Sequence, residues 1–253
     1  MYDRQIVERA LALSSQGFTD REVARMCDVS VAAIRHWRYG TRRSKESDRR
    51  KYDCPRCDDR PLNRRSYAYL LGLYLGDGHI AHCPKDVFRL EIACCDDWPG
   101  LIEAAAEAIS TVMPSNAVGR RRTKGCTMIG VFSKHLPCLF PQHGPGMKHT
   151  RKIELKAWQK EIVGEFTEEF IRGLIHSDGC RSMNRVRRPL KDGDRWYEYP
   201  RYLFVNESTD IRMLFANALE LLGIAWKQSN RKTISVARRE AVARLDEFVG
   251  PKY

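Results

Sequence analysis

The feature that most constrains this chain is a nine-residue stretch that occurs twice. Residues 70–78 read Leu-Leu-Gly-Leu-Tyr-Leu-Gly-Asp-Gly, and residues 171–179 read Ile-Arg-Gly-Leu-Ile-His-Ser-Asp-Gly. Both copies end a mostly apolar run with Asp-Gly, and Asp178 follows Asp77 by 101 residues. Repetition at this distance predicts two similar half-domains in one chain.

The composition of the repeat predicts two buried helices that pack against each other. Apolar residues at nearly every position indicate a helix that is buried on most sides. Small residues stand four apart, on one helix face, as Gly72 and Gly76 in the first copy and Gly173 and Ser177 in the second. Such faces let two helices approach backbone to backbone. The glycine after each aspartate would provide a left-handed end to the helix.

This packing would place the carboxylates of Asp77 and Asp178 side by side at one end of the helix pair. Two carboxylates at close range repel each other unless a cation lies between them. Mg²⁺ prefers oxygen ligands of this kind, so the pair predicts a magnesium site. The alternative interpretation is a pair of core helices with acidic ends and no chemistry.

The repeat resembles the signature of the LAGLIDADG homing endonuclease family, and the resemblance extends from about Ser66 to the C-terminus. It implies an α+β fold in which two pseudo-symmetric αββαββα half-domains form a DNA-binding saddle. It also implies that Asp77 and Asp178 are catalytic and bind metal.

The resemblance further implies a catalytic lysine near the scissile phosphate, which by position is Lys148, although a linker lysine is the alternative interpretation. Gly250-Pro251-Lys252 echoes the segment that ends at Lys148, so Lys252 would be its counterpart. His176 departs from the family, where an acidic residue is common. We interpret His176 as a polar residue with satisfied hydrogen bonds.

The first 45 residues predict a small all-α helix-turn-helix domain. Apolar spacing predicts a helix over residues 3–15, Thr19 with Glu22 predicts a capping box on a second helix, and Ser30 would cap a third. The unit resembles the helix-turn-helix domains of resolvases and transposases, although Asp28 stands where glycine is common. A three-helix module that binds protein is the alternative. By the register of the motif, the DNA-facing residues would be Ser30, Val31, Ala32, Arg35, His36 and Tyr39.

Charge and cysteine content restrict the class of protein. The formal charge is +12 and the pI about 9.4, which favours a polyanionic partner. No apolar run approaches the ~18 residues that span a membrane, and the charged start does not resemble a signal peptide. We therefore expect a cytoplasmic protein without a membrane segment. Nine cysteines, an odd number, fit reduced thiols better than a disulfide framework.

Cys54 and Cys57 have the C-x-x-C spacing of one zinc knuckle. A structural zinc site needs two further ligands, and no second C-x-x-C exists in the sequence. The alternative interpretation is a turn with two reduced thiols. The donors considered for the missing ligands are His79, His82, Cys83, Cys94 and Cys95.

The predicted domain plan has four parts: the helix-turn-helix domain (1–45), a basic linker with the C-x-x-C pair (46–65), the first half-domain (66–151), and a linker helix with the second half-domain (152–253). The linker helix is expected over residues 153–163. Basic residues on the two sheets would contact the duplex. They are Arg120, Arg121, Arg122, Lys124, Arg181, Arg185, Arg187, Lys227, Arg231 and Lys232.

The function that this pattern predicts is sequence-specific cleavage of double-stranded DNA by metal-dependent hydrolysis of phosphodiester bonds. The alternative is a transcriptional regulator that has the same fold without cleavage, which the N-terminal unit favours. A nucleoid or scaffold protein would leave the paired carboxylates unexplained. We expect a monomer with internal pseudo-two-fold symmetry.

Overall fold

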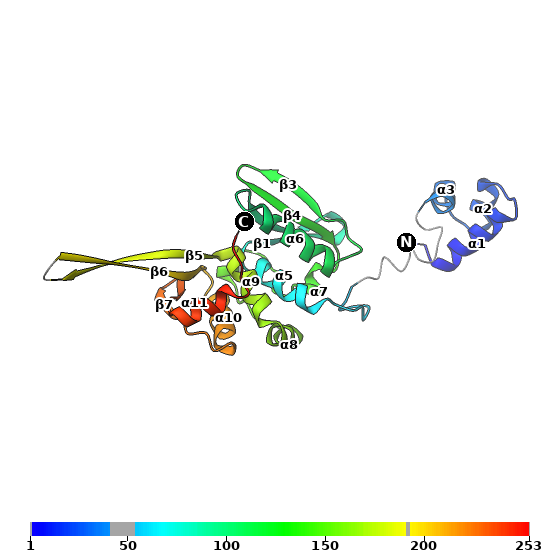
Figure 1. Ribbon diagram of the computed structural model, residues 1–253. Coiled ribbons are helices and arrows are strands. Elements are labelled where there is room, and N and C mark those ends of the chain that lie inside the picture. The colour runs from blue at the N-terminus through cyan, green and yellow to red at the C-terminus, as the bar shows by residue number, and fades with distance from the viewer. Residues whose placement is uncertain (1, 41–53, 191–192, 253) are drawn as a thin grey trace. The chain divides into compact units, whose positions relative to one another are not determined.

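The computed structural model describes residues 2–40, 54–190 and 193–252 of the 253-residue chain (Figure 1). The chain divides into two compact units, Met1–Arg60 and Pro61–Tyr253. The first part of the predicted basic linker, from residue 46 to residue 53, lies outside the described residues.

The first unit contains three helices, α1 (Arg4–Ser15), α2 (Asp20–Met26) and α3 (Val31–Tyr39). The Thr19 and Glu22 side chains form the predicted capping box, each accepting from the other residue's backbone N–H. The turn between α2 and α3 passes through Asp28 with φ 52°, a left-handed conformation that aspartate tolerates better than most residues. The buried residues of this unit are Val7, Ala10, Val23, Ala24, Ile34 and Trp37.

The second unit contains the αββαββα order twice, so the predicted α+β fold class is confirmed. The first half-domain consists of α5 (Arg64–Gly76), β1 (Gly78–Cys83), β2 (Val87–Cys95), α6 (Pro99–Val112), β3 (Gly119–Thr123), β4 (Cys126–Ser133) and α7 (Leu136–Leu139). The second consists of α9 (Thr167–Asp178), β5 (Gly179–Leu190), β6 (Gly193–Val205), α10 (Thr209–Leu221), β7 (Lys227–Asn230), β8 (Thr233–Val236) and α11 (Arg239–Asp246).

The connection between the half-domains holds α8 (Ala157–Glu165), which starts later than the predicted helix. Ile153 and Leu155 precede it as buried residues outside any helix. The backbone N–H of Ile153 instead donates to Asp210 Oδ2 at 2.8 Å. The Gln159 side chain accepts from the Lys156 N–H, which satisfies a free donor at the new helix start. Two short 3₁₀ segments, η2 (Pro84–Asp86) and η3 (Lys148–Thr150), lie in loops.

Each half-domain has a four-stranded antiparallel sheet, with strand orders β1-β2-β4-β3 and β5-β6-β8-β7. Alternate residues of β2 and β4, such as Leu90 and Val131, enter the core, which both half-domains share. Their neighbours, such as Arg89 and Phe132, point to the opposite side of the sheet. We call this side the open face of each sheet.

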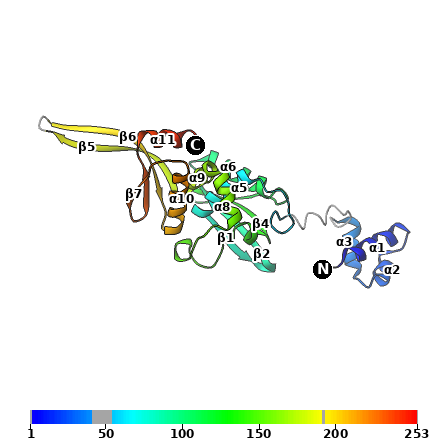
Figure 2. The same cartoon turned by 90° about the horizontal axis from the view of Figure 1, so that it is seen from below.

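The two half-domains differ most in their first hairpin. Strands β5 and β6 have 12 and 13 residues, whereas β1 and β2 have 6 and 9. The β5–β6 pairing is continuous from Gly179 opposite Phe204 to Leu190 opposite Gly193. Figures 1 and 2 show this hairpin projecting well beyond the rest of its sheet.

Helices α5 and α9 cross at their glycines. A Cβ atom at Gly72 would lie 2.6 Å from the Phe170 carbonyl oxygen, and one at Gly173 would lie 2.2 Å from that of Tyr69. Real Cβ atoms essentially never approach so closely, so the crossing requires glycine at both positions. This contact places the two copies of the repeat back to back in the centre of the unit.

The predicted left-handed ends of the two repeat helices are wrong. Gly179 has φ −105°, and Gly78 is not among the glycines with positive φ. Each glycine instead starts a strand directly after its helix. A Cβ at Gly78 would lie 2.5 Å from Tyr74 Cα, and one at Gly179 would lie 2.7 Å from Ile175 Cα. The sharp turn from helix to strand therefore explains both glycines.

Within the described ranges, none of the helices combines the length and apolar character needed to cross a membrane.

Candidate active site at the ends of the paired helices

The crossing of α5 and α9 brings the two aspartates of the repeat to one place. Asp77 caps the C-terminus of α5, and Asp178 is the last residue of α9. A Cβ at Gly76 would lie 2.0 Å from Ser177 Oγ and 3.1 Å from Asp178 Oδ2. The carboxylate of the second half-domain therefore lies against the end of the first helix.

Both carboxyl groups have raised pKa values. Burial, followed by the negative charge of Asp178, raises the pKa of Asp77 to about 6, although this residue keeps an exposed surface. Burial also raises the pKa of Asp178, against a hydrogen bond from Asn206 that lowers it. A cation would favour the ionised forms of both groups. The oxygen donors and their mutual repulsion thus fit Mg²⁺.

Lys148 lies at the C-terminus of α5. Its Nζ donates to the carbonyl oxygens of Tyr74, Leu75 and Gly76 at 2.7, 2.8 and 2.5 Å. These carbonyls are the last of the helix and carry its negative dipole end, which attracts a cation. Burial lowers the pKa of Lys148 to about 8, while the charges of Asp178 and Asp77 oppose this shift.

Lys252 makes the equivalent contact at the C-terminus of α9. Its Nζ donates to the carbonyl oxygens of Ser177 at 3.4 Å and Gly179 at 2.6 Å. Burial lowers the pKa of Lys252, and Asp77 is the largest influence that raises it. The repeat thus places one lysine at the end of each paired helix.

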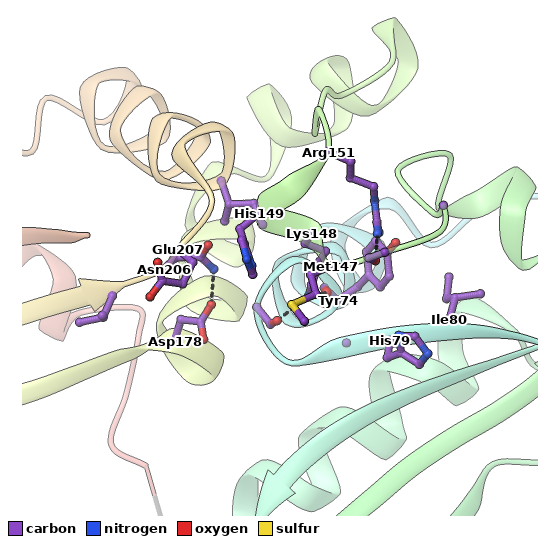
Figure 3. A pocket seen from close by; sticks show the side chains of 16 residues that line it. Tyr74, His79, Ile80, Met147, Lys148, His149, Arg151, Asp178, Asn206 and Glu207 are labelled. Carbon is purple, nitrogen blue, oxygen red and sulfur yellow. Dashed lines mark hydrogen bonds between the residues drawn. The ribbon is translucent and has the colours of Figure 1, made fainter. Parts of the chain in front are cut away.

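Two cavities open on this centre. One, of about 400 Å³, is lined by Asp178 together with Lys148, which comes from the other half-domain (Figure 3). The other, of about 230 Å³, is lined by Asp77 together with Lys252. Each cavity therefore combines the aspartate of one half-domain with the lysine of the other.

The two aspartates have different neighbours, one within β2 and the other directly after β6. Asn206 Nδ2 donates to Asp178 Oδ2 at 2.5 Å (Figure 3). Asn206 is itself fixed, because its Oδ1 accepts from the Ser208 N–H at 2.8 Å. Gly78 pairs with Ile92 and Gly179 with Phe204, so the position equivalent to Asn206 is Cys94. The Cys94 thiol is buried, and Asp77 contributes to the raised pKa of this thiol, about 12.

His176 has hydrogen-bond partners on both ring nitrogens. Nδ1 lies 2.9 Å from the Tyr69 hydroxyl and Nε2 lies 2.9 Å from the Val249 carbonyl oxygen. Burial lowers the pKa of His176 to about 4. The imidazole is therefore neutral at physiological pH. It also lines the cavity of Asp77 and Lys252.

The basic residues predicted on the first sheet do not share one face. Strand β3 is an edge strand, and Arg120, Arg121 and Arg122 alternate along it. Arg120 pairs bidentately with Glu103 of α6 at 2.5 and 2.6 Å, on the helix side. Arg121 lies on the open face, where it pairs with Glu91 at 2.9 Å. Lys124 lies in the β3–β4 turn, exposed to solvent.

Several predicted basic residues of the second sheet also pair with acidic neighbours. Arg181 binds Asp246 of α11 at 2.8 and 3.0 Å, which directs it to the helix side. Along the projecting hairpin, Arg185 pairs with Glu198 at 3.3 Å and Arg187 pairs with Asp194 at 2.5 Å. In the β7–β8 hairpin Lys232 pairs with Glu207, whereas Lys227 and Arg231 are exposed.

Sequence reasoning missed two arginines on the open faces, Arg89 and Arg201. They occupy equivalent positions, because Arg89 pairs with Ala81 and Arg201 with Ser182, each three residues after the glycine that starts the hairpin. In the part of the chain that the structure describes, the Nε atoms of both are buried without a hydrogen-bond partner. The signal available in the sequence was the alternation of polar and apolar residues along each strand.

In the first unit, the predicted DNA-facing residues lie at the start and on one side of α3. Ala32, Arg35, His36 and Tyr39 are exposed and follow helical spacing. The Ser30 hydroxyl caps the helix by accepting from the Ala33 N–H. Arg35 lies 3.5 Å from Asp20, which also pairs with Arg38 at 2.6 Å.

Cys54 and Cys57 lie near two possible zinc ligands that the sequence analysis did not predict. The ligand atoms of Cys54, Cys57, His135 and Cys138 all lie within 4.8 Å of one another, a Cys₃His set that could bind zinc. The donors considered from sequence are not members of this set. The signal available in the sequence was His135-x-x-Cys138, a second pair with metal-ligand spacing.

The fold is that of solved LAGLIDADG homing endonucleases. The structure of I-DmoI in complex with DNA and Mn matches with a TM-score of 0.51 and 14% identity, over 75% of this chain and 99% of that chain. I-WcaI bound to its DNA recognition sequence has a TM-score of 0.48 and 14% identity, over 83% and 88% of the two chains. I-AabMI, a LAGLIDADG meganuclease bound to uncleaved DNA, has a TM-score of 0.46 and 10% identity, over 72% and 82%.

These identities establish the fold alone, and the fold comparison rests on the first structure. A variant of I-DmoI was also crystallised with its target DNA in the presence of Mg. No protein-family model and no curated protein matches the sequence.

Proposed function

We propose that this chain is a sequence-specific double-stranded DNA endonuclease that hydrolyses phosphodiester bonds with a divalent cation. The observation that carries the proposal is the pairing of Asp77 and Asp178 at the adjoining ends of two crossed helices. Each aspartate lines a cavity with a lysine from the other half-domain. Two such cavities suit a substrate with two strands to cut. The net charge of +12 supports a DNA partner.

Asp77 and Asp178 would hold Mg²⁺, which supplies activation of water and stabilisation of charge on the phosphate. The carboxylates bind as oxygen donors, and Asn206 fixes the orientation of Asp178. The ammonium groups of Lys148 and Lys252 stand at the two cavities, where they stabilise negative charge that develops on a phosphate.

The two sheets would hold the duplex on their open faces. Arg89 and Arg201 lie at equivalent positions on the two open faces, and Arg89 Nη2 also pairs with Glu91 at 3.0 Å. Arginine side chains contact phosphates and guanine edges. The exposed side of α3 would extend the DNA site as the recognition helix of a helix-turn-helix.

The second candidate function is a DNA-binding regulator without cleavage. The observation that favours it is the exposed side of α3 in an N-terminal three-helix unit. In this case the saddle binds DNA, and the aspartates serve only to end the two helices. The two candidates differ in what happens to the DNA, so one experiment separates them.

The test is incubation of the protein with a randomised duplex library and Mg²⁺, followed by sequencing of the ends produced. The proposal expects defined cuts that disappear in the Asp77→Asn, Asp178→Asn double variant. Binding of the same sequences by both proteins is the control for folding. If neither protein cuts, but both retain the same bound sequences, the regulator is correct and the nuclease is rejected.

We further propose that Cys54, Cys57, His135 and Cys138 bind one structural zinc ion. Three thiolates and one imidazole are a complete tetrahedral set for zinc. Burial raises the pKa of the Cys54 thiol, against a hydrogen bond from the Arg56 N–H at 3.4 Å that lowers it, and bound zinc would deprotonate this thiol. The cysteines are free thiols, so no disulfide competes for these ligands.

The zinc proposal is tested by metal analysis of the purified protein and by the absorption spectrum after Co²⁺ replacement. We expect one zinc per chain, lost in the Cys54→Ser, Cys57→Ser variant and retained in the Cys83→Ser, Cys180→Ser control. Absence of zinc from wild-type protein, together with no thiolate–Co²⁺ band, would overturn it.

A further inference from the structure

The two lysines of the candidate site are carried by loops, so something else must hold them in place. Lys148 follows residues 141–147, and Lys252 follows residues 248–251. Neither preceding segment contains a helix or a strand. A lysine side chain has large rotamer freedom, and a loose backbone would add to it. The fixed contacts of these loops therefore decide where each ammonium group lies.

The loop before Lys148 is held by Arg151. Its guanidinium donates to the carbonyl oxygens of Gln142 at 3.3 Å, Pro145 at 3.5 Å and Gly146 at 2.5 Å. These contacts gather both ends of the loop around one side chain. Arg151 therefore holds the loop that precedes Lys148 in one conformation.

The segment before Lys252 is held by His176. Its Nε2 lies 2.9 Å from the carbonyl oxygen of Val249, and its Nδ1 lies 2.9 Å from the Tyr69 hydroxyl. Because a carbonyl oxygen only accepts, Nε2 carries the proton and Nδ1 accepts from the hydroxyl. Tyr69 and Val249 are both buried, so the two partners of the half-buried imidazole are shielded from water.

The chain from this bridge to the lysine is short. Val249 is followed by Gly250, which has φ 72°, then by Pro251 and by Lys252. The fixed φ of proline limits the conformations between the bridge and the lysine. Lys252 Nζ then reaches back to the Gly179 carbonyl at 2.6 Å. The end of the chain is thus fixed at two points near the end of α9: at Val249 by His176 and at Lys252 by the Gly179 carbonyl oxygen.

The first copy of the repeat shows that the histidine is not needed for packing. The equivalent position is Leu75, which is fully buried in α5. A buried imidazole costs desolvation unless both of its nitrogens are satisfied. His176 meets this condition only through Tyr69 and Val249. A leucine could fill the same place without hydrogen-bond partners. The role of His176 is therefore to form these two hydrogen bonds.

We propose that His176, fixed by Tyr69, is the positioning residue that holds Lys252 in the cavity of Asp77. The proposal rests on the proposed nuclease function and adds the residue through which one of its two lysines is controlled. His176 acts through the Val249 carbonyl and does not contact the phosphate. The first half-domain achieves the same result through Arg151, so the two lysines are controlled independently.

The structural test is amide hydrogen exchange of residues 249–252 in the full chain. His176→Leu, which introduces the residue of the first repeat, should raise exchange in this segment at least tenfold, and Tyr69→Phe should raise it less. His176→Gln, which can keep a donor to Val249, should restore part of the protection. His82→Leu, a change at an exposed histidine outside the site, is the matched control and should leave the segment unchanged. Unaltered exchange in His176→Leu would reject the bridge.

The functional test resolves the two strands of a cleaved duplex with separate end labels. His176→Leu should slow, by about tenfold, cleavage of the same strand that Lys252→Met slows, and leave the other strand unchanged. Arg151→Ala should slow the opposite strand. Equal slowing of both strands by His176→Leu would show a general structural role and reject the positioning role.

The outcomes also separate this inference from the function on which it rests. A wild-type protein that cuts no duplex rejects the nuclease, and the role of His176 in it. A protein that cuts, but in which His176→Leu changes neither strand, rejects the role of His176 alone.

Discussion

The ends of the two repeat helices show what the half-domains share and where they differ. Both helices pass a glycine crossing, end in aspartate, and bind a lysine ammonium with their last carbonyls. The side chains around these shared parts are different. Asp178 is bound by the Asn206 amide, whereas the equivalent neighbour of Asp77 is the Cys94 thiol.

This comparison separates the residues that the backbone geometry of the helix pair requires from those that it leaves free to vary. The glycines are fixed by backbone contacts shorter than a Cβ permits, and the lysines by helix ends that need a donor. The cavity-lining residues have no such requirement and have diverged, together with the length of the first hairpin. We therefore expect two strand-cutting sites that share a plan but differ in rate.

The largest effects are expected at the lysines. Lys148→Met and Lys252→Met should each slow cleavage of one strand on the order of 10²–10³-fold, because each removes a charge that stabilises the transition state. Strand-resolved cleavage rates measure this effect. Equal loss on both strands in either variant would contradict separate sites.

Exchanging the neighbours of the two aspartates, Asn206 and Cys94, should make the metal binding and cleavage rates of the two sites more similar. Asn206→Cys should weaken Mn²⁺ binding and slow the strand cut by the Asp178 site about tenfold, because second-layer hydrogen bonds orient metal ligands. Cys94→Asn should accelerate the other strand or tighten its Mn²⁺ binding. Electron paramagnetic resonance of Mn²⁺ titrations gives affinities without relying on cleavage. Asn116→Cys, which removes a half-buried amide that donates to the Phe132 carbonyl oxygen, is the control for the substitution itself.

The raised pKa of Asp77 predicts a change in stability of known sign. The folded carboxyl group binds its proton more tightly than the unfolded one, so stability falls as pH rises from about 3.8 to about 6. Asp77→Asn should therefore raise the free energy of unfolding at pH 7, by about 1 kcal/mol after allowance for solvent. Denaturant unfolding at pH 4 and pH 7 checks this.

Asp246→Asn is the matched control for the sign of the change in the free energy of unfolding. Its hydrogen bond from Arg181 lowers the pKa of Asp246, so this substitution should lower stability at pH 7. Opposite signs for the two aspartates support the assignment. A destabilised Asp77→Asn protein would contradict it.

The smallest effects are expected at the two equivalent arginines of the open faces. Arg89→Ala and Arg201→Ala should each weaken DNA binding a few-fold. If each contacts a phosphate, each should also reduce the salt dependence of log Kd by about one unit. Binding titrations at several salt concentrations measure this. Arg120→Ala, at a residue paired with Glu103 on the helix side, should leave the slope unchanged.

The architecture could be predicted from the sequence because the repeat contains residues that the backbone geometry requires. Gly72 and Gly173 mark the crossing, and Thr19 with Glu22 marks a helix start. Such signals are local, so one sequence contains them. The left-handed ends expected at Gly78 and Gly179 failed because glycine has two uses, positive φ and close approach, and the sequence does not distinguish them.

The surroundings of the site could not be predicted, because they depend on contacts between distant segments. The bridge from Tyr69 through His176 to Val249 joins residues more than 70 positions apart. The pairing of Asp178 with Asn206 depends on the register of β5 and β6. His135 and Cys138, which complete the Cys₃His set, are likewise distant from Cys54 and Cys57 in the sequence.

The measurement that tests the central claim most directly is strand-resolved cleavage by four single variants of one protein. The account predicts that Asp178→Asn and Lys148→Met impair the same strand, because these residues line one cavity. Asp77→Asn and Lys252→Met should impair the other strand, because they line the second. If Asp77→Asn and Lys148→Met, which belong to the same half-domain, impaired the same strand instead, the composite sites would be contradicted.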